Sequence, residues 1–178
     1  EYRVVVSLLK TANDQPVGEV ELATVRIEGR ARSFDVPPVS HLLVADFGGF
    51  IELLGYDLPT TTARPGGSIP LTLTWRAQAP TDVSYTAFVH LLDADEMVHG
   101  QQDSVPLGGA APTTGWLPGE VLSDAYQLPV SPMAPPGLYT IEVGFYDAAT
   151  NRRLSLLGAD GRPGGDRVLL DAQVRIEP

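Results

Sequence analysis

The sequence predicts an all-β protein, because three features recur along it. Apolar and polar residues alternate strictly in several segments, as in strands with one buried side and one solvent-facing side. Glycines and prolines fall between the short apolar runs, where they mark turns. No segment shows a convincing period of 3.6 residues, so the helix content should be small.

The alternation defines the strands in order. Residues 69–76 place Ile, Leu, Leu and Trp on one side and Pro, Thr, Thr and Arg on the other, and residues 138–147 and 168–176 alternate in the same way. Residues 84–93 are apolar on both sides, which predicts a central strand covered on both faces. From residue 50 onward seven strands are expected, at about 51–58, 69–76, 84–93, 96–103, 122–128, 138–147 and 168–176.

Short strands separated by turns favour an antiparallel β-sandwich of immunoglobulin or fibronectin type III character. Trp75 lies in the apolar row of the second strand. Tyr139 begins the sixth strand just after residues 135–137, where a tyrosine corner would sit. Residues 93–96 and 147–151 have the composition of tight turns, and the asparagine that ends the second can adopt a left-handed conformation.

The composition excludes several classes of function. The formal net charge of −10 argues against binding nucleic acid, which depends on Lys and Arg neutralising phosphates. The absence of cysteine removes disulfides, thiolate metal sites and cysteine nucleophiles together. Catalytic, phosphate-binding and dinucleotide-binding motifs are absent, so the sequence predicts no enzyme and no cofactor.

The N-terminal segment resembles the C-terminal one. EYRVVVSLLKTANDQPV parallels LYTIEVGFYDAATNRRL, which places Tyr2 on Tyr139, and VELATVRI parallels LLDAQVRI. The second copy is longer by the stretch LSLLGADGRPGGDR, and Glu19 and Glu21 fall where apolar residues would be expected. The alternative is two ordinary hairpins with similar strand composition.

This parallel predicts the domain organisation. Residues 1–28 are expected to be a β-hairpin left from a preceding repeat, 29–49 a linker and lead-in strand, and 50–178 the complete sandwich. A lone hairpin is marginal in water, so its apolar face must pack on the sandwich or on another copy of the chain, which would self-associate. That face consists of Val4, Val6, Leu8, Val25 and Ile27.

The histidines and the acidic turns are the candidate metal ligands in this sequence. His90 and His99 lie on either side of the turn at 93–96 and would be cross-strand neighbours, whereas His41 lies apart. We interpret them as solvent-facing or hydrogen-bonded strand residues rather than as metal ligands. Two groups of acidic residues resemble calcium ligands but are better explained by the turn preference of Asp: Asp147, Asp160 and Asp166, and Asp93, Asp95 and Glu96.

A sugar-binding patch is the main candidate ligand site. Trp116 lies in the long loop SVPLGGAAPTTGWLPGEV, and Gln101, Gln102 and Asp103 lie at the end of the preceding strand. Exposed aromatic rings with amide and carboxylate neighbours are typical of carbohydrate-binding modules. The favoured alternative is that Trp116 folds back to cover the edge of the sandwich and anchors the loop.

Several strings together resemble a known family: FGGFIELLGYDL, PGGSIPLTLTWRAQAP, YTAFVHLLDAD, QQDSVPLGGAAPTTGWLPGEVLSDAY and PPGLYTIEVGFYDAATNRRL. Residues 46–178 resemble the C-terminal β-domains of large membrane proteins of Chloroflexus-type bacteria. Many of these proteins begin with a multi-spanning segment similar to glycosyltransferases. The resemblance implies an extracytoplasmic domain, tethered through a membrane segment outside this sequence. It transfers no catalytic residue.

The sequence therefore predicts a non-catalytic extracytoplasmic accessory and interaction module of a larger membrane-attached protein. Its expected partners are the neighbouring domains of that protein. The alternative is a carbohydrate-binding module for a cell-surface glycan.

Overall fold

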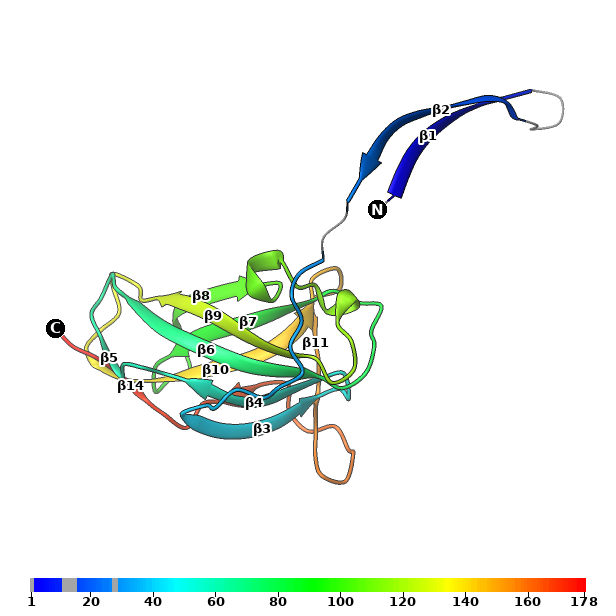
Figure 1. Ribbon diagram of the computed structural model, residues 1–178. Coiled ribbons are helices and arrows are strands. Elements are labelled where there is room, and N and C mark those ends of the chain that lie inside the picture. The colour runs from blue at the N-terminus through cyan, green and yellow to red at the C-terminus, as the bar shows by residue number, and fades with distance from the viewer. Residues whose placement is uncertain (1, 11–15, 27–28) are drawn as a thin grey trace. The chain divides into compact units, whose positions relative to one another are not determined.

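The computed structural model describes residues 2–10, 16–26 and 29–178, and Figure 1 shows its ribbon. The chain divides into two compact units, Glu1–Ala31 and Arg32–Pro178. The first contains a two-stranded hairpin and the second two larger sheets. The predicted all-β sandwich is confirmed, because the helices in the described residues are two short 3-10 turns.

The strands are joined mostly by short turns. In chain order they are β1 Tyr2–Leu9, β2 Pro16–Val25, β3 His41–Phe47, β4 Ile51–Asp57, β5 Thr62–Ala63, β6 Ser68–Ala77, β7 Tyr85–Leu92, β8 Val98–Ser104, β9 Val121–Pro129, β10 Gly137–Asp147, β11 Arg152–Arg153, β12 Leu156–Leu157, β13 Val168–Leu169 and β14 Val174–Ile176. The 3-10 turns η1 Leu107–Gly109 and η2 Thr113–Gly115 lie in the long loop between β8 and β9.

Two sheets form the sandwich. One has the order β12-β3-β4-β6-β9, and the other has the order β5-β14-β10-β7-β8, with β11 and β13 also paired to β10. Adjacent strands are antiparallel except β14 and β5, which run parallel. The chain therefore crosses from one sheet to the other after β4, β5, β6, β8, β9, β11 and β12, and successive strands supply both walls of one core.

The predicted apolar rows of β6 and β10 meet in this core. The Trp75 ring lies edge-on to Phe145, with 4.8 Å between centroids, and Phe47 of β3 makes a second edge contact with Phe145 at 5.5 Å. Edge-on packing suits the ring quadrupoles and adds to the free energy gained from burial. The other fully buried members of the two rows are Ile69, Leu71, Leu73, Tyr139, Ile141 and Val143.

Strand β7 is covered on both faces, as its sequence predicts. Phe88 points outward, yet its ring is almost fully buried. A Cβ at Gly144 of β10 would lie only 2.4 Å from that ring, so glycine allows the ring to lie against the sheet. The Arg153 guanidinium covers the other side of the ring, 4.1 Å from its centroid.

Tyr139 forms the expected tyrosine corner. Its hydroxyl donates a hydrogen bond of 2.7 Å to the carbonyl of Pro135, four residues earlier. This bond ties the start of β10 to the turn that follows β9. The left-handed conformation expected at Asn151 is also present, with φ of 55°.

The expected start of the sandwich at residue 50 is wrong. The compact unit begins at Arg32, and β3 pairs with β4 along much of its length. Leu42 and Val44 face outward and are 81% and 67% exposed, so apolar residues occupy both sides of β3 and hide its period. Residues 32–49 therefore belong to the sandwich and are not a free linker.

The single strand expected at 168–176 is divided into β13 and β14. Between them the Asp171 carboxylate accepts a hydrogen bond from the Tyr56 hydroxyl. That hydroxyl in turn accepts one from the backbone N–H of Ala172 at 3.0 Å. A side chain of the opposite sheet thus satisfies polar groups where the ladder is interrupted.

Candidate functional site

Trp116 does not form the candidate sugar platform but folds back onto the sandwich, as the favoured alternative predicts. Its ring is 5% exposed and belongs to the core cluster, and its Nε1 donates a hydrogen bond of 2.8 Å to the carbonyl of Ala111. Thr113 anchors the same loop, because its hydroxyl donates to the Val83 carbonyl at 2.6 Å and accepts from the Tyr85 N–H at 2.9 Å. Trp116 therefore holds the long loop against the sandwich.

The three polar residues of the expected patch serve other contacts. The Gln102 Oε1 accepts a hydrogen bond of 3.0 Å from the Gln127 N–H, which joins β8 to β9 across the edge of the sandwich. Asp103 lies 3.2 Å from His90 Nε2. Gln101 is exposed and is paired with His90 in the β7–β8 ladder. The patch of Trp116 with these residues is not formed, since its aromatic member is buried.

The two histidines expected to be neighbours face different partners. A register shift between Leu91 and Leu92 disrupts the β7–β8 ladder beside His99. His99 Nε2 lies 2.7 Å from Asp93, and its ring meets Tyr139 edge-on at 5.4 Å. His41 stacks on Tyr56, with 4.5 Å between ring centroids. All three histidines are thus engaged in contacts within the sandwich.

Carboxylates of the acidic turns accept hydrogen bonds from the backbone of their own turns. Asp93 accepts the backbone N–H groups of Asp95 and Met97, both at 2.9 Å. Asp147 accepts the Ala149 N–H at 2.9 Å, and Asp160 does the same for Arg162 at 3.1 Å. Within residues 2–10, 16–26 and 29–178, no three His, Cys, Asp or Glu side chains are grouped to hold a metal ion.

A charged cluster centred on Glu142 lies on the outer face of the second sheet. Glu142 is 2% exposed, and its two oxygens lie 2.8 Å from His90 Nδ1 and 2.8 Å from Arg167 Nη1. Arg153 approaches the same carboxylate at 3.6 Å. Arg167 also pairs with Glu96 at 2.9 Å. We name these five residues the Glu142 cluster.

The partners of Glu142 favour its ionised form. Burial by itself would raise the pKa of Glu142, but the hydrogen bonds from His90 and Arg167 outweigh it and lower that pKa. The hydrogen bond to Glu142 in turn raises the pKa of His90. A carboxylate saturated by cationic donors is a poor general base, whereas it can hold separate segments together. The cluster joins β7 and β10 to β11 and to the segment before β13.

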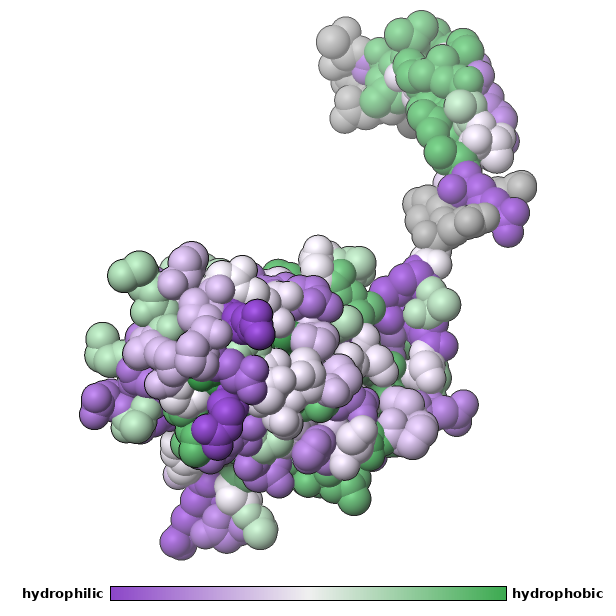
Figure 2. All heavy atoms as spheres, turned by 90° about the vertical axis from the view of Figure 1, so that its left-hand side faces the viewer, coloured by the Kyte–Doolittle hydropathy of each residue, from purple (hydrophilic) through white to green (hydrophobic). Residues whose placement is uncertain are grey.

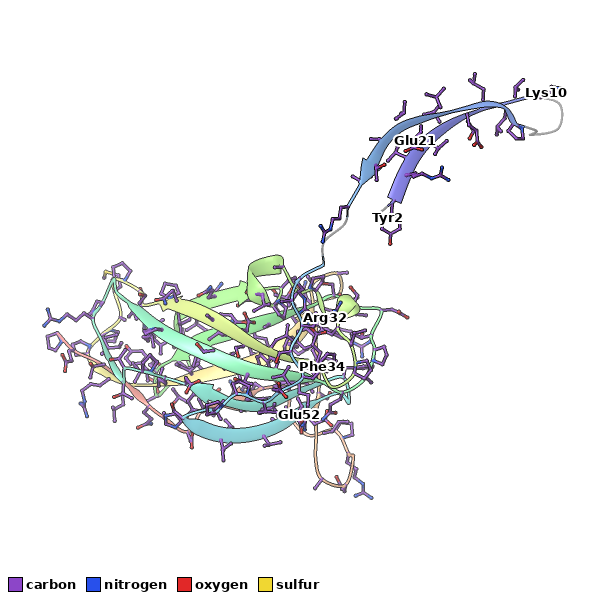
Figure 3. The ribbon with its side chains drawn as sticks, in the orientation of Figure 1. Tyr2, Lys10, Glu21, Arg32, Phe34 and Glu52 are labelled. Carbon is purple, nitrogen blue, oxygen red and sulfur yellow. The ribbon has the colours of Figure 1, made fainter. Side chains whose placement is uncertain are left out.

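Arg32 fastens the start of the sandwich unit. Its Nη1 lies 2.5 Å from Glu120 Oε2, and it donates to the Gly115 carbonyl at 2.9 Å. The Glu120 side chain is fully buried and also accepts the Leu117 N–H at 3.0 Å. Figure 3 places Arg32 and Phe34 on the segment that crosses the sandwich before β3. This segment is therefore clamped to the long loop.

The hairpin has two unlike faces. Cross-strand partners share a face, and the ladder pairs Val4 with Ala23 and Val6 with Val20. Every residue of β1 and β2 is exposed, including Val6 at 48% and Leu8 at 68%. The space-filling view shows hydrophobic residues gathered over the hairpin (Figure 2). We call one side the apolar face: Tyr2, Val4, Val6, Leu8, Gly18, Val20, Ala23 and Val25. Ile27, which the sequence also predicts on this face, lies outside the described residues.

The opposite face of the hairpin satisfies its own polar groups. Arg3 and Glu21 form an ion pair at 3.6 Å, and the Ser7 hydroxyl donates to Glu19 at 3.2 Å. The Thr24 hydroxyl also donates to Glu21, at 3.4 Å. We call this side the polar face. It also carries Val5 and Leu9, whereas the apolar face has no charged residue and has the composition of a sheet face that packs on a core.

No family model matches the chain, and no curated protein matches it with significant similarity. In the described residues, no helix is both long and apolar enough to span a membrane.

Proposed function

We propose that this chain is a non-catalytic accessory and interaction module of a larger extracytoplasmic, membrane-attached protein, and that it docks neighbouring domains. The observation that carries the proposal is the apolar face of the hairpin. Six large apolar side chains are exposed there, while the opposite face has its polar groups paired. A sheet with one such face is stabilised by packing on another element.

The anchoring of Arg32 supports a docking role. Because Arg32 is held by Glu120 and Gly115, the connection to β2 is limited to residues 26–31. Six fully extended residues span roughly 20 Å. A domain that covers the hairpin would thus be joined to the sandwich by a short stretch of chain, as expected for consecutive domains of one protein.

The proposed cellular location of the module is based on its resemblance to a known family. Residues 46–178 resemble C-terminal β-domains of membrane proteins of Chloroflexus-type bacteria. An extracytoplasmic location and a membrane tether are proposed on that basis. The tyrosine corner at Tyr139 supports an immunoglobulin-like or fibronectin type III-like assignment of the sandwich.

A comparison of residues 1–178 with residues 32–178 tests the docking role. The shorter chain keeps the whole core, so its melting temperature should equal that of the longer chain. The longer chain should associate weakly as its concentration rises, measured by sedimentation, because its apolar face is exposed. Val6→Lys should abolish this association, and Val5→Lys, on the polar face opposite Glu21, should preserve it.

The proposal fails if residues 32–178 melt clearly below the full chain, because the hairpin would then be part of the sandwich. It also fails if Val6→Lys and Val5→Lys associate alike. The carbohydrate-binding alternative has lost its Trp116 platform. Selective binding of the intact chain on a glycan array would restore it as a competitor.

A further inference from the structure

The apolar face of the hairpin has a covered counterpart in the same chain. The internal parallel aligns residues 2–8 with 139–145 and residues 20–25 with 169–174. The first pair of segments lies in β1 and β10, and the second lies in β2 and the β13–β14 region. The sandwich therefore shows what surrounds such a hairpin when its partner strands are present.

The two hairpins begin in the same register. Tyr2 pairs with Val25 in the hairpin. The aligned residues Tyr139 and Val174 also pair in the sandwich. Sequence similarity alone does not require this agreement, because similar strands can pair in different registers. A shift of one residue in the pairing would turn every side chain of a strand to the other face.

A β-bulge resolves the mismatch in the alignment. Glu21 aligns with Leu170, which is buried in the sandwich, so an uninterrupted ladder would direct Glu21 toward a core. The hairpin ladder shifts between Val4 and Val5, and Val5 pairs with Glu21 while Val4 pairs with Ala23. The shift moves Glu21 to the polar face and leaves the apolar face without a charge.

In the sandwich, β10 is the counterpart of β1, and it is covered both on its inner face and along one edge. The inner side chains of β10 pack on the opposite sheet, as the contacts of Phe145 with Trp75 and Phe47 show. The outer edge of β10 pairs with β7 from Thr140 to Asp147. In the hairpin the equivalent side chains are exposed, and β1 pairs with β2 and no other described strand.

We propose that the hairpin β1–β2 is the closing hairpin of a second β-sandwich and binds an open sandwich that lacks its last two strands. This inference rests on the proposed docking function and names its partner. The partner presents an apolar sheet equivalent to β4, β6 and β9 and a free strand edge equivalent to β7. The hairpin fills the positions that β10 and β14 fill in the complete sandwich.

A second copy of this chain is a poorer occupant. Its own sandwich already has β10 and β14 in the closing position, so no equivalent place is open. Two hairpins packed face to face would cover their side chains but leave the outer edge of each β1 without strand partners. An open sandwich satisfies both the apolar face and the strand edge.

A fused chain tests this inference. A second copy of residues 32–137 is placed directly before Glu1 of the full chain. Tyr2 then follows the Gly137 of the added copy by two residues, which is the spacing between Gly137 and Tyr139 in the original sandwich. The added strands should fold with the hairpin into a second sandwich, and the unfolding enthalpy should rise to nearly twice its value. Amide exchange in β1 should slow by about a hundredfold or more relative to the unfused chain.

The control uses the two valines on opposite faces. Val6→Lys in the fused chain should remove the second sandwich and its exchange protection, because it places a charge in the new core. Val5→Lys should retain both. In each variant the original sandwich at 32–178 should still melt at its usual temperature, which shows that the chain remains folded.

Two results would overturn the inference. One is a fused chain with no added unfolding enthalpy and no slowing of exchange in β1. The other is a fused chain that still self-associates in a manner reversed by Val6→Lys, which would make a second copy the occupant. If the unfused chain still associates through the apolar face, either result contradicts the open-sandwich partner but not the proposed docking function. The two proposals can therefore be refuted independently.

Discussion

Replacing Glu142 by glutamine should destabilise the sandwich. Glutamine keeps the size of the side chain but removes the negative charge that accepts from His90 and Arg167 at 2.8 Å each. Its amide can accept only one of these bonds well and directs its NH₂ group toward the other donor. The segment before β13, held by Arg167, should loosen first.

The magnitude follows from the partners. Hydrogen bonds to charged groups contribute about 1.5–3 kcal/mol each when buried. The Arg167 and Arg153 side chains are 31% and 33% exposed, so water can solvate them after the charge is lost. We therefore expect a total loss of about 2–3 kcal/mol in the free energy of unfolding. For a unit of this size that corresponds to a fall of about 4–10 °C in melting temperature.

Calorimetry of the full chain measures this loss, and Glu96→Gln is the matched control. Glu96 pairs with the same Arg167, but its side chain is 64% exposed, so its removal should cost under about 1 kcal/mol. A Glu142→Gln protein that melts like the wild type would refute the reasoning. So would equal losses in the two variants, because burial of Glu142 would then not matter.

Three further predictions concern single side chains. Tyr139→Phe should lower the free energy of unfolding by about 1 kcal/mol through loss of the bond to Pro135, and an unchanged urea midpoint would contradict this. Trp116→Ala should cost about 3–5 kcal/mol, and a variant of wild-type stability would show that the ring is not packed. His90 has a raised pKa because Glu142 accepts its hydrogen bond. The stability that protonated His90 gives the folded protein is therefore complete below pH 6.5 and is lost as the pH rises through the pKa of His90 in the folded state. His90→Gln should remove this decrease in melting temperature between pH 6 and about 9, and an unchanged slope of melting temperature against pH would contradict the prediction.

Much of the sandwich could be predicted because its strands have one buried side. The residues of 69–76 and 138–147 alternate strictly, and both rows meet in the core. Strand β3 was predicted only as a lead-in strand outside the sandwich, because Leu42 and Val44 are apolar but face outward and hide its period. The break between β13 and β14 depends on Tyr56 of the other sheet, which no local pattern reveals.

The candidate sites were harder to predict, because they depend on contacts between distant segments. The composition of the long loop is compatible both with an exposed Trp116 and with the buried ring that donates to Ala111. The Glu142 cluster was missed altogether. A glutamate on the polar side of a central strand was its one local signal, and Arg153 and Arg167 approach it from a loop that leaves the sheet and returns.

The apolar face of the hairpin is tested most directly by hydrogen exchange in the dilute 178-residue chain. We predict that the amides of β1 exchange far faster than those of β10, because a two-stranded hairpin without a covered face is marginally stable. Equal protection of β1 and β10 in a monomer would contradict the account. The hairpin would then be covered by its own chain and would have no face to offer a partner.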